Sequence, residues 1–365
     1  MSAGCPDLPI VVFPANNEVR ARTRPAAPVR AALRDATASL RHLHTALLNP
    51  GGANDVLRKA TDDAVDQVRR LAIEAVVPPM DTAPLKPIVP HHIYFGIRTA
   101  PLHDPYLVSE VTTVGARVLA DIRHARLGLN DRDAEVCSMI RLLEGLDPGP
   151  GAPAQHPTAA SAGTGTLYEP GHDELTRWII AHQLYLMLTL AAADSVNRAV
   201  TALKAGERET AHDALHEAAM YVRGFTAAMV HAGDMSAPCY GARVRPTMQP
   251  PALPEALSGG VMPEPRAFRK AMRTLVKVSC KPFDMLITTD PELAFARDAL
   301  LEADLINIER HVIVAADQVG TDSSIVRHDP NAESAVASLR MMRHARAVTY
   351  RDLMRFGDPV SLTNQ

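Results

Sequence analysis

The chain has 365 residues, of which 47% are hydrophobic and 22% charged, so it carries ample apolar material for a buried core. The formal net charge of −3 shows no excess that would indicate binding to nucleic acid or to an anionic membrane. No run approaches the ~18 apolar residues of a membrane-spanning helix, and the N-terminus lacks the basic and apolar regions of a secretory signal.

The cysteine pattern adds a further limit. Cys5, Cys137, Cys239 and Cys280 are widely spaced, with no CxxC and no CxxCH. This spacing argues against a zinc ribbon, an iron–sulfur site and haem attachment through two thioethers. Free thiols in a reducing cytoplasm are the expected state.

In chain order, a proline-rich extended arm over residues 1–27 precedes a single helical domain over 28–357 and a C-terminal tail over 358–365. Spacings of three and four between apolar residues, with Gly and Pro as breaks, predict most of the domain to be helix. Residues 76–104 and 236–265 are rich in proline, which predicts irregular segments. The composition of residues 147–171 predicts a flexible surface loop. The predicted helices are 29–48, 54–75, 105–126, 131–145, 173–204, 207–231, 265–280, 291–319 and 331–356. The fold class is therefore all-α, with antiparallel helices around a shared core.

The helix predicted at 173–204 has one unusual face. Trp178, His182, Tyr185 and Thr189 follow one another at spacings of four, three and four, so they share a face. An aromatic face with a group that titrates near neutrality suits a pocket for a flat ring and a proton transfer. A core stripe with polar tips at its edge is the alternative.

A second histidine interrupts the apolar helix at 305–320. His311 is followed directly by Val312, Ile313 and Val314, so its two ring nitrogens must be satisfied without water. A haem iron on one nitrogen is one solution. A core histidine hydrogen-bonded within the fold is the other.

Several segments resemble the histidine-ligated haem-dependent aromatic oxygenases. AHQLYLMLTLAAADSV, at 181–196, resembles the distal helix of tryptophan 2,3-dioxygenase, and ERHVIVAADQVGTDSS, at 309–324, resembles its proximal helix. HAGDMSAPCYGARVRPTMQPP, at 231–251, and FGIRT, at 95–99, are closer to the haem-dependent tyrosine hydroxylase branch. The resemblance implies a helical bundle of the tryptophan 2,3-dioxygenase type that encloses a haem.

By this resemblance, His311 is the haem-iron ligand and His182 the distal histidine that accepts a phenol or indole proton. Trp178 and Tyr185 line the substrate pocket. Arg245 and Arg98 would hold the substrate carboxylate. For Arg245, a solvated loop arginine without this role is the alternative. One branch of the family tethers haem through a cysteine four residues past the ligand, where this chain has Ala315, so we expect non-covalent haem b.

The implied activity is ring hydroxylation of an aromatic amino acid, tyrosine or a derivative, with O2 or H2O2 in a natural-product pathway. The family also suggests a homodimer or homotetramer. The chain departs from the dioxygenases at 258–270 and in the 320–324 turn, which has one glycine. These departures speak against tryptophan ring cleavage.

Three alternatives stay open at this stage. One is a ring-cleaving dioxygenase, and another is a non-enzymatic helical interaction protein. The last is a metal site on His91, His92 and His103, although no helical i, i+4 pair places two of them beside an acid.

Overall fold

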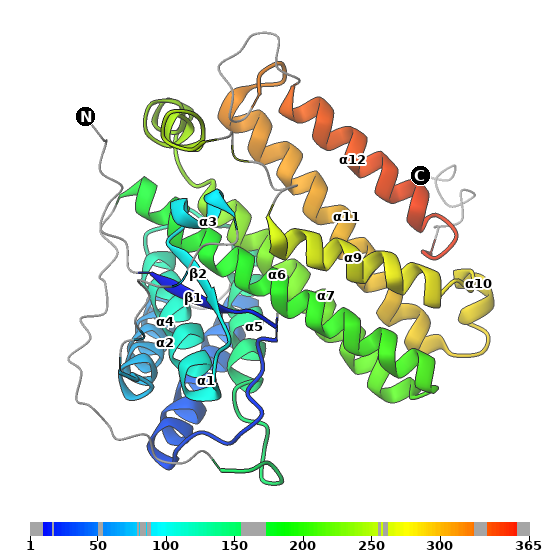
Figure 1. The fold of residues 1–365 in the computed structure, drawn as a ribbon, viewed down its shortest axis with the longest axis horizontal. Helices are drawn as coiled ribbons and strands as arrows, with labels where there is room; N and C mark the ends of the chain where they lie inside the picture. Colours follow the sequence, from blue (N-terminus) through cyan, green and yellow to red (C-terminus); the bar gives the residue numbers. More distant parts are fainter. Residues whose placement is uncertain are drawn as a thin grey trace.

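The computed structural model describes residues 10–16, 18–49, 54–78, 80, 85, 89–154, 173–254, 257, 262–324 and 334–355. Helices dominate this part of the chain, as the sequence predicts (Figure 1). Most of the predicted loop at 147–171 and the whole tail at 358–365 lie outside the described residues. The division into arm, domain and tail stays a prediction.

The N-terminal half forms a group of helices beside a small sheet. The helices are α1 (Ala27–Leu48), α2 (Asn54–Glu74), α3 (Pro90–Tyr94), α4 (Asp104–Ile122) and α5 (Leu129–Glu144). α1 packs on α2 and α5, and α4 packs on α2. The sheet pairs β1 (Val11–Pro14) with β2 (Ile97–Ala100) in parallel.

The sheet is the main departure from the predicted elements. The apolar start of the arm forms the fully buried β1, and the proline-rich stretch predicted to be irregular contains α3 and β2. Each strand has only four residues, too few for an alternating pattern to be distinctive. The pairing joins segments more than 80 residues apart, so it depends on tertiary contacts that no local pattern reports.

Two long helices form the centre of the molecule. α6 (Glu174–Ala205) and α7 (Arg208–Ala232) pack against each other, and α7 also packs on α5. A short α8 (Ala237–Cys239) follows, and then a π turn at Tyr240–Val244 and a 3-10 turn at Arg245–Met248. By length and composition α6 could cross a membrane, but 83% of its most apolar window is buried, as in a core helix.

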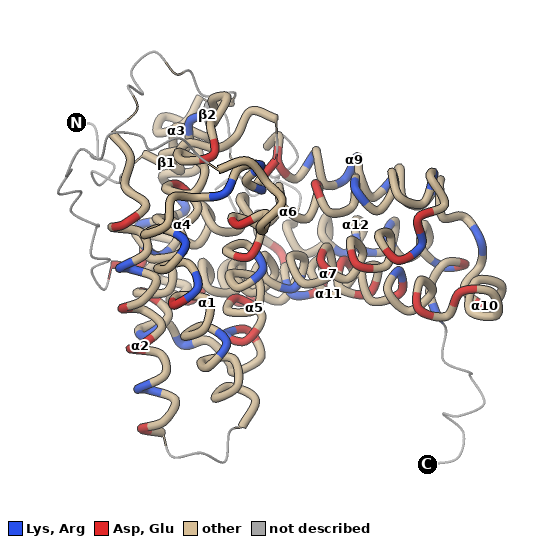
Figure 2. The backbone as a smooth tube through the Cα atoms, turned by 90° about the horizontal axis from the view of Figure 1, so that it is seen from below, with Lys and Arg blue, Asp and Glu red and all other residues tan. Residues whose placement is uncertain are grey.

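The C-terminal helices extend away from the first group. They are α9 (Pro263–Val278), α10 (Phe283–Leu286), α11 (Pro291–Val319) and α12 (Ala335–Tyr350). α9 packs on α6, α11 packs on α7, and α12 packs on α11. The two helical groups project in different directions from the centre, and charges of both signs are interspersed along them (Figure 2).

Local chemistry sets the ends of the two site-bearing helices. Asp173 accepts a hydrogen bond from the Thr176 amide at the start of α6, and Asp290 does the same for the Leu293 amide at the start of α11. The carboxylate satisfies an amide that has no partner within the helix. α6 ends at Gly206, which has a left-handed φ of 76° that favours glycine.

One glycine allows α7 to approach α5 closely. A Cβ added at Gly224 would lie 2.3 Å from Cβ of Ser138, well inside van der Waals contact. The same helix ends at Gly233, where an added Cβ would lie 2.8 Å from Cγ1 of Val314 on α11. α7 therefore connects the N-terminal helices to the helix that carries His311.

Candidate functional site

The site begins with one face of α6. From Thr176 to Ala193 every residue is buried except His182 and Tyr185, which keep part of their surface accessible. These two residues are three positions apart and share the face that the sequence singles out. α6 packs on α4, α7 and α9, so these two are the least covered side chains of an otherwise buried stretch.

The imidazole of His182 is held in one tautomer. Its Nδ1 lies 2.7 Å from the carbonyl oxygen of Trp178, and because a carbonyl only accepts, Nδ1 must carry the proton. The ring stacks on Phe95 at 4.8 Å between centroids and touches the Trp178 ring at 4.1 Å. Nε2 is left as an acceptor.

The charge state of His182 follows from its surroundings. Burial lowers the pKa of His182 to about 4, and the nearby His311 acts in the same direction. The second effect means that the two predicted histidines, 129 positions apart in the sequence, lie within electrostatic reach of each other. At neutral pH His182 is therefore uncharged and able to take up a proton.

Gln183, a residue not singled out from the sequence, holds the backbone of Phe95, whose ring stacks on His182. Nε2 of Gln183 donates to the carbonyl oxygen of Phe95 at 2.8 Å. The Phe95 ring, which opens the FGIRT segment, thereby keeps its stacked position against His182. The histidine–glutamine order of the motif could have signalled this role, because adjacent helix positions point in different directions.

His311 lies on α11 where the hydrophobic core divides. Ile308, Val312 and Ala315 pack against Val336 and Leu339 of α12 in a small cluster separate from the main core. α6 and α11 both pack on α7 but make few direct contacts with each other. The helices that carry the two histidines are therefore joined mainly through α7.

The ring of His311 meets the requirements of a metal ligand. Burial lowers its pKa to about 4, with a further contribution from the positive charge of Arg346, so the imidazole is neutral at pH 7. Among the described residues none hydrogen-bonds to either ring nitrogen. A neutral imidazole with a free nitrogen is the form that ligates iron. The indole N–H of Trp178 is a second buried polar group without a described partner.

A cationic cluster lies at one edge of the site. Asp304, fully buried on α11, accepts hydrogen bonds from Arg269 at 2.9 Å, Arg346 at 3.2 Å and the Tyr350 hydroxyl at 2.8 Å. Burial would raise the pKa of Asp304, but Arg269 and Arg346 hold it below its usual range. Two guanidinium groups share one carboxylate, so the cluster has one surplus positive charge near Tyr185 and His311.

Of the two arginines named from the sequence, Arg98 lies in β2 and Arg245 begins the 3-10 turn that follows α8. Nη2 of Arg245 donates to the carbonyl oxygen of Ser324 at 2.6 Å, which connects the turn after α8 to the turn after α11. Nη1 of Arg98 donates to the carbonyl oxygen of Ile97 at 2.9 Å. For Arg98, no ion pair to a described acidic residue is found.

The histidine-rich segment before β2 does not form the alternative metal site within the described residues. His92 is fully buried, and its Nε2 lies 2.9 Å from Oε1 of Glu264 at the start of α9. His103 is exposed at the start of α4 and takes no part in this pair. Glu264 lies close enough to Tyr185 to affect its charge state, so the His92–Glu264 pair borders the site.

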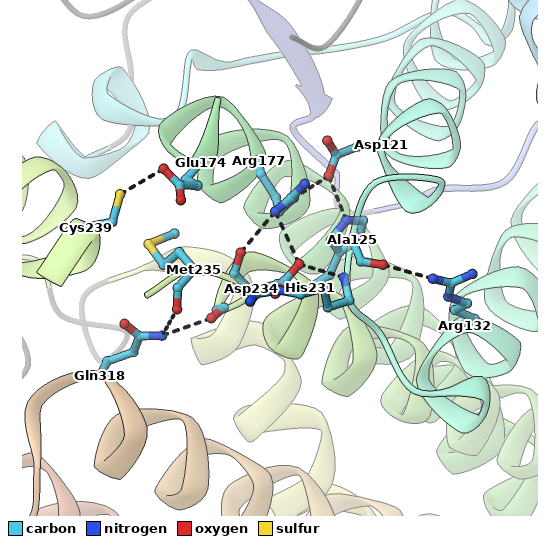
Figure 3. A network of polar contacts seen from close by, with 12 residues as sticks. Asp121, Ala125, Arg132, Glu174, Arg177, His231, Asp234, Met235, Cys239 and Gln318 are labelled. Carbon is cyan, nitrogen blue, oxygen red and sulfur yellow. Dashed lines mark hydrogen bonds and ion pairs between the residues drawn. The ribbon is translucent and has the colours of Figure 1, made fainter. Parts of the chain in front are cut away.

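The 231–234 segment of the HAGD motif anchors the helices (Figure 3). His231 lies between Glu135, at 3.1 Å from Nδ1, and Asp121, at 2.9 Å from Nε2. Burial alone would lower the pKa of His231, but the two carboxylates outweigh this effect and raise the pKa to about 9. Arg177 of α6 donates to Asp121 at 2.7 Å and to Asp234 at 3.2 Å. This network ties α4, α5, α6 and α7 together one helical turn from His182.

Comparison with known proteins identifies the family of the chain. The family model for the SfmD 3-methyl-L-tyrosine peroxygenase matches residues 19–296, which is most of the chain. The chain belongs to this peroxygenase family. The match includes His182 and the ion network of His231, Asp121, Arg177 and Asp234, and it ends within α11 before His311.

Two relatives give the extent of the similarity. The 3-methyl-L-tyrosine peroxygenase of Streptomyces lavendulae is 29% identical over 132 residues, which are 35% of this chain and 36% of that protein. A crystal structure of reduced SfmD, obtained by soaking with sodium hydrosulfite, covers 82% of this chain and 97% of that chain, with 18% identity and a TM-score of 0.48.

Proposed function

We propose that the protein is a haem-dependent peroxygenase that hydroxylates the ring of tyrosine or a tyrosine derivative such as 3-methyl-L-tyrosine. Membership in the peroxygenase family and the name of the Streptomyces lavendulae relative support the reaction class and the kind of substrate. The observation that carries the proposal is that two neutral histidines, His182 on α6 and His311 on α11, lie within electrostatic reach of each other.

The residues present fit a haem. His311 would supply the iron ligand through its unpartnered nitrogen, and the apolar cluster that contains Ile308 and Val312 beside it suits a macrocycle. When bound, the haem would supply the chemistry by which peroxide or O2 oxidises the ring. Ala315 offers no thiol four residues past the ligand, so the haem would be bound without a covalent tether.

The chain's own residues would position the substrate and control its proton. Trp178 and Tyr185 would bound the aromatic ring, one on each side of His182 along the helix face. Nε2 of His182 would accept the phenol proton, because Nδ1 is already committed to the Trp178 carbonyl. The neutral state of His182 at pH 7 makes this acceptance possible.

The substrate carboxylate requires a positive partner. Arg245 and Arg98 are the candidates from the sequence resemblance. The surplus charge shared by Arg269 and Arg346 beside Asp304 offers a third, and these guanidinium groups already lie near Tyr185. Replacement of Arg245, Arg98 and Arg346 in turn by methionine would assign the role, because loss of the carboxylate contact raises KM most.

A spectrum of the purified protein tests the cofactor first. We expect a Soret band that shifts when tyrosine or 3-methyltyrosine is added. His311→Ala should purify with little haem, whereas His103→Ala, in an exposed histidine, should retain it. Stoichiometric haem in His311→Ala would refute the ligand, and a colourless wild-type protein would favour an interaction protein without enzymatic activity.

Mass spectrometry of the product tests the reaction. Peroxygenase activity adds one oxygen atom to the substrate, whereas a ring-cleaving dioxygenase adds two and yields an N-formyl product. His182→Ala should lose most of its kcat in either case, and full turnover would refute the proton-acceptor role. A homodimer or homotetramer and a cytoplasmic location stay predictions.

A further inference from the structure

Three donor side chains converge between α1 and α5, away from the two histidines of the proposed haem site. Nδ1 of His44 lies 2.6 Å from Oδ1 of Asp133 and 3.3 Å from Sγ of Cys137. The sulfur lies 3.9 Å from the same carboxylate oxygen. Among the described residues this is the one group of histidine, cysteine and acidic side chains whose ligand atoms gather closely enough for a metal ion.

The triangle has nearly the dimensions of a zinc site. Zinc binds sulfur at about 2.3 Å and nitrogen or carboxylate oxygen at about 2.0–2.1 Å in a tetrahedron, so its ligand atoms are separated by roughly 3.3–3.6 Å. The sulfur–nitrogen separation of 3.3 Å falls at the lower edge of that range, and the sulfur–oxygen separation of 3.9 Å exceeds it by a few tenths of an ångström. Only the nitrogen–oxygen pair would have to open, by under an ångström.

The placement of the donors favours a preformed site. Asp133 and Cys137 are four residues apart on α5, so both side chains project from one helix face. His44 projects from the neighbouring α1, which packs on α5. Helical backbones fix all three donors, and their partial exposure leaves room for a water molecule as fourth ligand.

The chemistry of the donors selects the ion. Thiolate, imidazole and carboxylate together suit Zn²⁺, whereas Mg²⁺ and Ca²⁺ prefer oxygen alone. A thiolate and a carboxylate balance the charge of the ion. Burial and the neighbouring Asp133 raise the pKa of Cys137 to about 11, and Arg223 on α7 opposes this only in part, so a bound ion would have to displace the thiol proton.

We propose that His44, Asp133 and Cys137 bind one Zn²⁺ ion that clips α1 to α5. The site is independent of the haem proposal, because neither helix carries a residue of the haem site. Zinc bound only to the folded state would raise the melting temperature with zinc concentration.

The test uses the full-length protein as purified, stripped of zinc with a chelator under reducing conditions. Titration with ZnCl2 in a calorimeter should show one ion bound per chain. Absorption spectroscopy at the zinc edge, which is separate from that of iron, should show one sulfur neighbour at about 2.3 Å. Cys137→Ser and His44→Asn should each weaken binding by at least about 100-fold.

Cys280→Ser is the matched control, because Cys280 is a free and exposed cysteine outside the cluster. It should bind zinc as the wild type does. A zinc neighbour shell without sulfur, or equal affinity in Cys137→Ser and Cys280→Ser, would overturn the proposal and assign the bound zinc to surface histidines. If His44→Asn does not fold, Cys137→Ser and the spectroscopic sulfur signal still decide between these outcomes.

Discussion

Glu110 makes the stability of the β1–β2 region sensitive to pH. Its carboxylate lies on α4 beneath β1 and accepts a hydrogen bond from the Val12 amide at 3.1 Å. Burial raises the pKa of Glu110 to about 7, and the hydrogen bond and the charge of Arg117 only partly oppose this effect. Replacing Glu110 with glutamine keeps an acceptor for the amide and removes the titration.

The sign and size of the effect follow from the two pKa values. Below pH 4.5, Glu110 is protonated in both the folded and the unfolded chain and has no effect on the pH dependence of stability. Between pH 4.5 and about 7 the unfolded chain loses the proton first, so folding stability falls as pH rises. A pKa difference of about 2.5, at 1.36 kcal/mol for each pKa unit, gives about 3 kcal/mol, which partial contact with water reduces to about 2 kcal/mol.

Urea unfolding followed by circular dichroism at several pH values between 4.5 and 8 measures this difference. The free energy of unfolding of Glu110→Gln, relative to the wild type, should rise by about 2 kcal/mol across the range. Glu302→Gln, in an exposed glutamate on α11, serves as control and should run parallel to the wild type. Parallel curves for Glu110→Gln and the wild type would refute the burial of this carboxylate.

Three further predictions follow from contacts described above. Gly224→Ala should lower the free energy of unfolding by about 1–3 kcal/mol through its clash with Ser138, and adding Ser138→Gly should restore part of it in thermal melts. His231→Gln should lower the free energy of unfolding by about 3–5 kcal/mol, because Glu135 stays buried without its cation. The pKa of His231 is raised to about 9, so the greater stability of the wild type is complete below pH 6.5 and should disappear as pH rises through 9. Trp178, the single tryptophan, should lose its fluorescence as haem is titrated into haem-free protein, and unchanged emission would place the haem elsewhere.

The helices were predictable because their information is local. The stripes of α6 and α11, their acidic N-caps and the Gly206 stop lie within a few residues of one another in the sequence, and the structure confirms each of these helices. The pairing of β1 with β2 was missed, because two four-residue strands become a sheet only through contacts made across the whole N-terminal half.

The site residues also divide into those that the local sequence indicates and those that only the tertiary structure brings together. His182, Trp178 and Tyr185 lie on one helix, so their spacing alone placed them together, and the resemblance added His311. The charge cluster of Asp304, Arg269 and Arg346 could not be foreseen, because three different helices bring it together. The HAGD motif was noticed for its family likeness, and its physical role as a buried ion network required coordinates.

The bond from His182 to the carbonyl one turn earlier in its own helix has a consequence for evolvability. Many histidines in enzymes depend on a distant residue to fix which nitrogen holds the hydrogen, and they lose that preference when the distant residue changes. Here the helix backbone itself sets the preference. Under the proposed function, neighbouring side chains can therefore be exchanged to fit new substrates while Nε2 keeps its lone pair available to accept a proton.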